Sequence, residues 1–247
     1  MRFRNRLCLS AMAGINNSDF VKRFKVGLAI LGGFNADKKA NEAAIKSLKR
    51  GRREFIFENP IEDIEKEIVS ALDSYGRIAV NVRASSIDSY VNVAKICSEY
   101  DVILEINAHC RQPEFLEIGA GQSLLFNQEK LLNIVESCSK YCEVSVKIRG
   151  GLNIDYSSLS KRLFSSAFIL HVDAMIPGGG ADYSLIKEIS ALGNVIGNNS
   201  VKDINTARKM VESGAKLVSL ARAVIKNERI FDELLEDDIL SSPIEVI

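Results

Sequence analysis

Short runs of apolar, often β-branched residues alternate with longer amphipathic stretches along almost the whole chain. A run of about four to eight apolar residues is typical of a strand that is buried on both faces, whereas apolar positions three or four residues apart are typical of a helix with one buried face. Eight of these runs predict strands, at 7–11, 26–31, 78–82, 102–107, 143–148, 168–172, 194–197 and 216–220.

The amphipathic stretches predict helices, many of which begin after Asp, Ser or Asn, the residues that best cap a helix N-terminus. They lie at 37–50, 60–74, 87–99, 128–140, 156–165, 183–192, 203–213 and 222–235. Repeated strand–helix units form parallel sheets, and right-handed crossovers close eight such strands into a barrel. The pattern therefore predicts an α/β fold of the (β/α)8 or TIM-barrel class, built as one domain.

One segment interrupts this alternation. Residues 51–59, with the sequence GRREFIFEN, form an extra extended stretch between the second and third predicted strands. The stretch either belongs to a loop or is itself a barrel strand, which would shift the strand numbering by one. No linker rich in Pro, Gly or Ser divides the chain, so we expect the barrel to occupy 1–236 and a tail to occupy 237–247.

Composition narrows the class of protein. The 247 residues include 32 basic and 32 acidic side chains, so the bulk charge does not favour a polyanionic partner such as nucleic acid. The absence of an apolar leader and of any apolar run of about 18 residues predicts a cytoplasmic protein that is not bound to a membrane. Five cysteines, an odd number, fit a reducing compartment better than a disulfide framework.

Chemically reactive side chains stand at the carboxyl ends of predicted strands. His109 and Cys110 follow one strand, Lys147 ends the next, and His171 ends the one after it. In parallel barrels the loops at this rim converge and form the active site, whereas the opposite rim mainly contributes stability. We therefore expect an enzyme whose site includes these four residues.

Lys147 and Arg149 leave the fifth predicted strand in the sequence Val-Lys-Ile-Arg-Gly-Gly. Because side chains alternate between the two faces of a strand, both cations point to the same side and the apolar neighbours to the other. A lysine that points into a barrel mouth is costly unless it meets an anion or a dipole. This position predicts a negatively charged ligand, unless the lysine is solvated at the strand end.

The loops after the seventh and eighth predicted strands suggest a phosphate site. They contain Gly197-Asn-Asn-Ser-Val201 and Leu220-Ala-Arg-Ala223. In barrels these two loops, together with a helix N-terminus, often present backbone N–H groups to a phosphate. The alternative is that the first loop is a simple tight turn and that Arg222 lies on the surface.

Cys110 lies beyond its strand in a polar loop, unlike Cys8 and Cys97, which lie inside apolar runs, and this position favours a catalytic thiol. The two histidines of the chain, His109 and His171, could donate a proton or bind phosphate or metal. A zinc site is disfavoured because His109 and Cys110 are adjacent on an extended chain and point apart, so no metal is expected.

Five stretches carry motifs in a fixed order. They are Ala11-Met-Ala-Gly-Ile15 followed by Asp19-Phe20, Glu105-Ile-Asn-Ala-His-Cys110, Gly119-Ala-Gly-Gln-Ser-Leu-Leu125, Val144-Ser-Val-Lys-Ile-Arg149 and Gly197-Asn-Asn-Ser-Val201. These stretches resemble A-P-M-A-G-[VI]-T-D, D-[IL]-N-x-G-C-P, G-A-x-L-L, V-[TS]-V-K-x-R and G-N-G-D-I of the tRNA-dihydrouridine synthases. That family consists of flavin-dependent barrel enzymes, related more distantly to the dihydroorotate dehydrogenases. The resemblance covers nearly the whole barrel.

The resemblance implies that FMN lies across the carboxyl rim. Asn81 would take the place of the family's glutamine at the flavin edge, and Lys147 and His171 would lie beside the ring. An ammonium group next to flavin N1 stabilises the reduced, negatively charged form. The remaining contacts would come from Ala11, Met12 and Ala13 on the isoalloxazine and from Gly197, Asn198, Asn199, Ala221 and Arg222 on the phosphate.

The resemblance also implies a reaction. Flavin N5 would exchange a hydride with one carbon of a C=C bond in a uracil-like substrate, and Cys110 would give a proton to the other carbon, with Lys147 and His171 as further catalytic residues. Proton donation by a positioned acid contributes about 10²–10⁴-fold to a rate. The substrate would be contacted by Asn107, His109, Arg149 and Asp173.

Some departures from the family pattern lie on the substrate side. His109 and Arg111 replace the Gly and Pro that flank the family's cysteine, and Asp173 replaces the arginine of H-G-R-T. In the segments expected at the phosphate, Asn199 replaces a loop glycine and Ala221-Arg222 replaces the usual G-R. The helical domain with which the synthases grip tRNA is not expected after the barrel. The resemblance therefore supports flavin binding more strongly than tRNA processing.

Two other functions stay open. A barrel that binds a phosphorylated metabolite would use Cys110 and Lys147 for aldol or Schiff-base chemistry, and a non-catalytic descendant of the family would serve as a subunit or scaffold. The main expected partner is a small-molecule or nucleobase substrate. Weaker candidates are a second copy of the chain and tRNA, for which the only basic surface is the run from Lys46 to Arg53.

Overall fold

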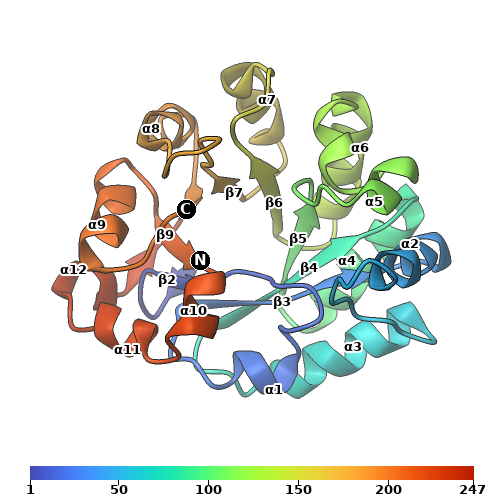
Figure 1. The fold of residues 1–247 in the computed structure, drawn as a ribbon, viewed down its shortest axis with the longest axis horizontal. Coiled ribbons are helices and arrows are strands. Elements are labelled where there is room, and N and C mark those ends of the chain that lie inside the picture. The colour runs from blue at the N-terminus through green and yellow to red at the C-terminus, as the bar shows by residue number, and fades with distance from the viewer.

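Eight parallel strands close into a barrel in the computed structural model, which describes residues 1–247. The strands follow chain order around the barrel, which Figure 1 shows end-on. The predicted (β/α)8 barrel is confirmed, and each predicted strand overlaps one barrel strand. These are β2 (Leu7–Leu9), β3 (Leu28–Asn35), β4 (Arg77–Arg83), β5 (Ile103–Asn107), β6 (Val144–Arg149), β7 (Ile169–Asp173), β8 (Val195–Asn198) and β9 (Leu217–Leu220).

Helices surround the barrel (Figure 1). They are α1 (Ser18–Val21), α2 (Lys38–Leu48), α3 (Pro60–Ala71), α4 (Ile87–Glu99), α5 (Pro113–Glu117), α6 (Gln128–Ser139), α7 (Tyr156–Leu163), α8 (Tyr183–Ser190), α9 (Ile204–Glu212), α10 (Arg222–Lys226), α11 (Ile230–Leu234) and α12 (Asp238–Ser241), with a 3-10 helix at Gly121–Leu125. Eight begin with a side-chain cap, in line with the capping pattern of the sequence, and the capping residues are Asn17, Asp37, Ser86, Asn127, Asp155, Asp182, Asp203 and Asp237. None is long and apolar enough to span a membrane.

The helix predicted at 222–235 is in fact two helices, α10 and α11. Asn227 interrupts it with an extended backbone, at φ −142° and ψ 97°. Its side chain binds the Glu233 carboxylate and accepts the backbone N–H of Arg229. Local hydrogen bonds of this kind compete with helix formation, which explains the break.

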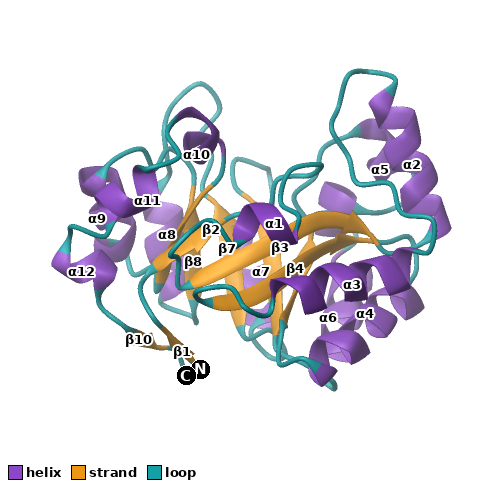
Figure 2. Ribbon diagram, turned by 90° about the horizontal axis from the view of Figure 1, so that it is seen from below, coloured by secondary structure: helices purple, strands orange, loops and turns teal.

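The two chain ends together close the amino rim of the barrel. β1 (Arg2–Phe3) and β10 (Ile244–Glu245) pair as a small antiparallel sheet. Phe3 and Val246 are buried and join the apolar cluster inside the barrel. The segment predicted as a tail after residue 236 therefore contains α12 and β10, and Figure 2 shows both termini opposite to α2, α5 and α10.

The barrel interior changes character from the amino to the carboxyl rim. The part of the interior near the amino rim is apolar and contains Cys8, Leu28, Ile30, Ala79, Ile103, Ile169, Ile196 and Leu217. Polar side chains follow two residues further along the strands, and the alternation of a strand sends them to the same inner face. Because these polar residues are buried among the strands, their partners must come from one another.

The excursion after β3 forms an extension of the carboxyl rim. Residues 51–59 contain no strand, so the alternative reading of this stretch as a barrel strand is wrong. Phe55 and Phe57 pack against Phe34 at centroid distances of 4.8 and 5.2 Å, and the Asn35 side chain donates to the Phe55 carbonyl at 2.8 Å. Aromatic packing and one buried amide therefore fix this loop beside the barrel mouth.

Candidate active site

A chain of hydrogen bonds crosses the middle of the barrel, one layer below the mouth. His171 Nδ1 lies 2.7 Å from Glu105 Oε2, and His171 Nε2 lies 2.7 Å from Ser219 Oγ. Burial lowers the pKa of His171. The imidazole is therefore neutral at pH 7, with Nδ1–H donating to the carboxylate and Nε2 accepting from the serine hydroxyl.

His171 is completely buried, and both of its ring nitrogens have partners. The structure places it under the mouth, where the imidazole has no free nitrogen for a ligand. A catalytic or cofactor-binding role for His171 would require one of these two hydrogen bonds to break. In the observed arrangement its function is to orient Glu105.

Lys147 points into the barrel, as the alternation predicted, and is only 6% exposed. Its Nζ donates to Ser10 Oγ at 2.5 Å. Burial alone would raise the pKa of Glu105, but contact with His171, the charge of Lys147 and the amide of Asn81 hold it at about 2. Glu105 thus places a carboxylate of the protein itself in the electrostatic field of Lys147, and the negatively charged ligand expected near this lysine stays a prediction.

Two asparagines connect this layer to the loop after β5. Asn81 donates to Glu105 Oε1 at 2.7 Å, and Asn107 donates to Asn81 Oδ1 at 2.8 Å. Asn107 Oδ1 accepts the backbone N–H groups of His109 and Cys110, at 3.1 and 2.9 Å. The second amide N–H of Asn107 has no partner in this network and is available to a ligand.

His109 and Cys110 point to opposite sides of the mouth. His109 Nε2 lies 2.5 Å from Asp173 Oδ2, and Arg149 Nη1 lies 3.2 Å from the same oxygen. Asn199 donates to the other oxygen of Asp173 at 2.7 Å. Although burial opposes ionisation, these contacts hold the pKa of Asp173 well below its usual range. The four residues form one polar cluster on the β6–β7 side of the mouth.

On the other side, Cys110 lies beside a buried ion pair that sequence reasoning missed. Arg83 Nη1 lies 3.6 Å from Cys110 Sγ, and Arg83 Nη2 lies 2.5 Å from Glu54 Oε2. Arg83 follows Asn81 by two residues on β4, so the alternation that selected Lys147 and Arg149 would also have found it. Glu54 comes from the rim extension and gave no signal in the sequence.

The first-strand motif forms a tight loop at the mouth. Asn16 donates to the carbonyls of Ser10 and Ile30, at 3.1 and 2.9 Å, and so ties the loop to β3. Met12 is 9% exposed and lies at its tip between Ala11 and Ala13. Gly14 has φ +69°, and a Cβ there would lie 2.7 Å from Arg53, so the rim extension packs directly against this loop.

The two segments predicted to bind phosphate differ in the hydrogen-bond donors that they leave free for a ligand. Asn198 donates to Ser219 Oγ, and Asn199 is engaged with Asp173. Gly197 faces outward, where a Cβ would meet Met210 and Ala215. In contrast, α10 begins at Ala221–Arg222 without a side-chain cap, so its first N–H groups can bind an anion.

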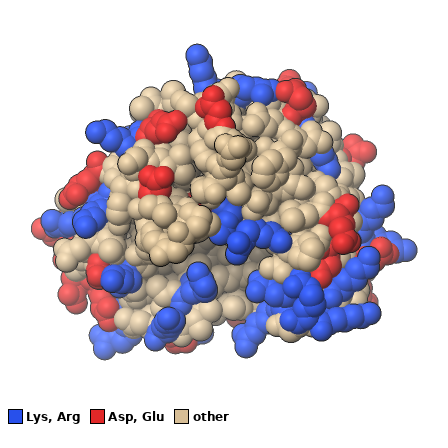
Figure 3. All heavy atoms as spheres, turned by 45° about the horizontal axis from the view of Figure 1, so that its top comes forward, with Lys and Arg blue, Asp and Glu red and all other residues tan.

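The buried charges of the mouth balance one another. Three cations, Lys147, Arg149 and Arg83, are matched there by three carboxylates. Arg149 and Arg83 form ion pairs with Asp173 and Glu54, and Lys147 lies in the electrostatic field of Glu105 while it donates to Ser10. Exposed basic residues follow the strand ends in the chain, and they include Arg52, Arg53, Arg111, Lys202 and Arg222. Figure 3 shows Lys and Arg side chains along the lower half of its view. The mouth itself is therefore neutral, with positive charge around it.

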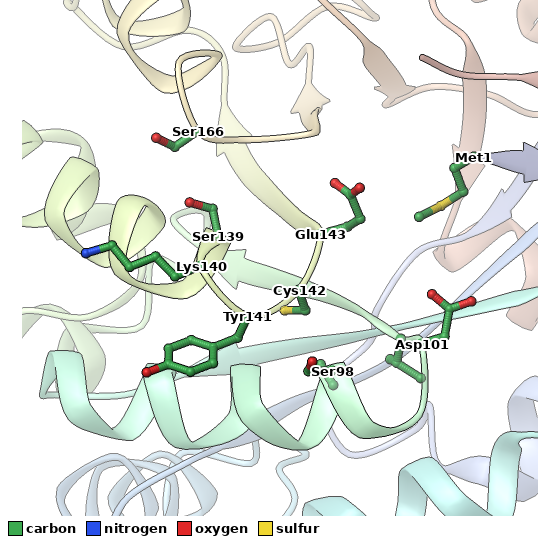
Figure 4. Close-up of a pocket in the computed structure, with 11 residues that line it drawn as sticks. Met1, Ser98, Asp101, Ser139, Lys140, Tyr141, Cys142, Glu143 and Ser166 are labelled. Carbon is green, nitrogen blue, oxygen red and sulfur yellow. The ribbon is translucent and has the colours of Figure 1, made fainter.

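A hollow of about 360 Å³ lies at the amino rim, on the side of the barrel opposite to Cys110 and Lys147 (Figure 4). Its lining comes from the residues that precede β5, β6 and β7, including Asp101, Tyr141, Cys142 and Ser166. In parallel barrels catalytic residues gather at the carboxyl ends of the strands. We therefore place the candidate active site at the carboxyl rim, around Cys110 and Lys147.

No family model matches the chain. In solved structures the chain is similar to FabK from Thermotoga maritima, with a TM-score of 0.59, 13% identity and coverage of 90% of this chain and 63% of that one. It is also similar to DHODH from Eimeria tenella, with a TM-score of 0.63, 13% identity and coverage of 94% and 80%. The chain thus spans less than two thirds of FabK, and these likenesses support the fold.

Sequence similarity extends to an uncharacterized protein, MJ0144, of Methanocaldococcus jannaschii. The two chains are 32% identical over 235 residues, which cover 90% of each. The aligned part therefore covers most of the barrel. This chain belongs to the same protein family as MJ0144 of Methanocaldococcus jannaschii.

Proposed function

We propose that this protein is a flavin-dependent oxidoreductase that binds FMN at the carboxyl rim and acts on a C=C bond, in the manner of the dihydrouridine synthases. The observation that carries the proposal is the meeting of Lys147, Asn81, Asn107 and Cys110 at one mouth, from three neighbouring strands. FabK and DHODH share the fold, and the choice of cofactor is supported by the resemblance of the motifs to those of the flavin-dependent dihydrouridine synthases.

The residues present fit FMN. The uncapped start of α10, at Ala221 and Arg222, would hold the phosphate, and Lys147 would lie beside the ring. Met12 and Ala13 would provide an apolar contact for the isoalloxazine. When bound, FMN would supply hydride exchange with a carbon of the substrate.

Cys110 would hold and donate the proton. Asn107 fixes the loop that carries the thiol through two backbone N–H groups, and its own free N–H would donate to a substrate carbonyl. A proton donor works only when it is held within hydrogen-bond reach of the reacting atom. The asparagine therefore orients both the substrate and the acid.

The charge of the mouth favours a neutral substrate head. Arg83 and Arg149 are paired with carboxylates and Lys147 donates to Ser10, so a ligand with its own negative charge would gain little there. A uracil-like ring offers carbonyl and N–H groups without a charge. We therefore propose a uracil-like or similar unsaturated amide, with tRNA as one carrier of such a base.

The contacts of Lys147 argue against the Schiff-base alternative. Its Nζ is a donor to Ser10 and lies in the field of the Glu105 carboxylate, which is the environment of an ammonium ion. A Schiff base needs a neutral, nucleophilic amine. The non-redox barrel is therefore the weaker proposal.

An absorbance spectrum tests the cofactor. We expect flavin bands in the purified protein or after addition of FMN, with weaker binding in the Lys147→Ala variant. Lys202→Ala, an exposed rim lysine, is the matched control and should bind FMN like the wild type. A colourless protein that ignores added FMN would contradict the proposal.

A further inference from the structure

Arg83 and Glu54 form a buried ion pair, and Arg83 contacts Cys110, a candidate catalytic residue. Both side chains are 1% exposed. The Arg83 guanidinium also donates to the Gly33 carbonyl at 3.0 Å and lies 3.8 Å from the centroid of the Phe115 ring. Four separate contacts therefore fix the guanidinium in a single orientation.

In that orientation one guanidinium nitrogen faces the thiol. Arg83 Nη1 lies 3.6 Å from Cys110 Sγ, within reach of a hydrogen bond to sulfur. An arginine N–H is only a donor, so it can stabilise a thiolate but cannot accept the thiol proton. Burial strengthens this interaction because water does not screen it.

The surroundings of Cys110 contain few other charges. The side of α2 that packs near it is alanine, at Ala40, Ala43 and Ala44, and Gly121 contacts its backbone. Four charged or titratable side chains lie along its own loop and α5. His109 points away to Asp173, and Glu114 is paired with Arg50. Arg111 and Glu117 are exposed. Arg83, with Glu54, is therefore the charged pair that acts directly on the sulfur.

We propose that Arg83 is a positioning residue, held by Glu54, that orients the Cys110 thiol and stabilises its thiolate. For the reaction this inference rests on the proposed function. When the Cys110 S–H bond breaks, the proton would go to a substrate carbon and the electron pair would stay on sulfur, while FMN, bound as proposed and in its reduced form, would supply the hydride to the other carbon. The Arg83 N–H then faces the new negative charge, and solvent returns the proton.

The two members of the pair should act in opposite directions. Removing the positive charge withdraws support from the thiolate, whereas removing Glu54 leaves the full charge of Arg83 directed at the sulfur. A purely structural role would instead make both variants behave alike. The sign of the effect therefore separates positioning from packing.

The test is the rate at which iodoacetamide alkylates Cys110 at pH 7, measured on the Cys110 peptide by mass spectrometry without added FMN. The thiolate is the reacting form. We expect Arg83→Gln to slow alkylation about tenfold or more, Glu54→Gln to accelerate it several-fold and Arg83→Lys to recover part of the rate. Cys142, half-buried at the opposite rim, is an internal control whose rate should not change.

A rate at Cys110 that changes in the same direction in both single variants, or by less than twofold in both, would overturn the proposal. Should a single variant fail to fold, the double variant Arg83→Met/Glu54→Gln removes both charges together. It should alkylate more slowly than the wild type, because no N–H then faces the sulfur, and a wild-type rate would equally overturn the proposal. If the signs hold but no variant binds FMN, the positioning pair stands and the proposed function fails.

Discussion

Two arginine–carboxylate pairs flank the mouth of the barrel, and they differ in burial and in how many contacts the protein makes with the guanidinium group. Arg83 and Glu54 are both 1% exposed, and the guanidinium contacts a carbonyl, a carboxylate, an aromatic ring and a thiol. Arg149 and Asp173 are 10% and 9% exposed, and only Nη1 of Arg149 is engaged by side chains. The first pair takes its partners from the protein, with only the buried Nε of Arg83 left without one, whereas the second keeps several donors free for a ligand.

This difference teaches that similar residues at one rim can have different tasks. A buried pair with all its partners in the protein fixes its neighbours, and breaking it leaves an uncompensated charge. A pair with free donors at the mouth can exchange partners when a substrate enters. We therefore propose that the Arg83 side positions Cys110 and that the Arg149 side contacts the substrate.

The largest expected effect is on stability. Glu54→Gln should lower the free energy of unfolding by about 3–5 kcal/mol, because the Arg83 charge then stays buried without its counter-ion. Asp173→Asn should cost less, since Arg149 can turn toward water. Urea unfolding followed by circular dichroism measures both.

The exposed pair of Arg50 and Glu114 is the control for this comparison. Arg50 is 46% exposed on its side chain, so Glu114→Gln should change stability by only about 0–1 kcal/mol. A loss for Asp173→Asn that equals or exceeds the loss for Glu54→Gln would show that the two pairs are not different in kind.

Lowering the pH should destabilise the protein through Glu105, which lies in the hydrogen-bonded layer below the two pairs. The folded protein holds the pKa of Glu105 at about 2, below the ordinary value of 4.5. The unfolded state therefore binds the proton first, so this stabilisation is complete above about pH 4.5 and is lost as the pH falls toward 2. Asp173, with its lowered pKa, adds to the loss in the same direction.

Glu105→Gln removes the titrating group while keeping a side chain that can hydrogen-bond. The variant should be less stable than the wild type at pH 7 by a few kcal/mol, and the difference should shrink as the pH falls. Unfolding midpoints in urea between pH 7 and pH 3 measure this convergence. Parallel curves for the two proteins would mean that Glu105 does not titrate as assigned.

The barrel and one half of its mouth could be predicted from the sequence because they follow from strand periodicity. Lys147 and Arg149 share a face by alternation, and the same rule reaches Arg83 once Asn81 is placed inside. Glu54 could not be predicted, since its place depends on how a loop after β3 packs against Phe34 and Gly14.

His171 illustrates a second limit. A strand end predicts which rim a side chain approaches, but not the layer in which it stops or the partners that occupy it. Its two hydrogen bonds come from β5 and β9, which lie 66 and 48 residues away in the chain. Pairing of β1 with β10 is hidden for the same reason, because the two short strands lie at opposite ends of the chain.

Activity should separate the two arginines if the proposed function holds. Arg149→Gln removes free donors at the mouth and should lower kcat/KM about 10–100-fold, mostly through KM, in proportion to a hydrogen bond from a charged group of about 1.5–3 kcal/mol. Arg83→Gln should act mainly on kcat. Steady-state kinetics with a uracil-like substrate measure the split, and equal KM effects in the two variants would erase the distinction.

The smallest expected effect concerns Asn199 in the loop after β8. Its side chain supports the Arg149–Asp173 pair, which we call the open pair because it keeps donors free. Its backbone has φ 99°, a conformation that favours glycine, and its side chain donates to Asp173. Asn199→Gly loses the hydrogen bond but relieves the backbone, so a net loss of about 1 kcal/mol is expected.

Asn199→Ala loses the same hydrogen bond and keeps the strained backbone, so it should be less stable than Asn199→Gly by about 1–2 kcal/mol. Unfolding of the two variants in urea isolates the backbone cost, because both lack the contact to Asp173. If alanine is as stable as glycine, the left-handed backbone is not what selects the residue here. The hydrogen bond to Asp173 would then explain why this loop holds an asparagine, and the open pair would depend on its neighbours as closely as the Arg83 pair does.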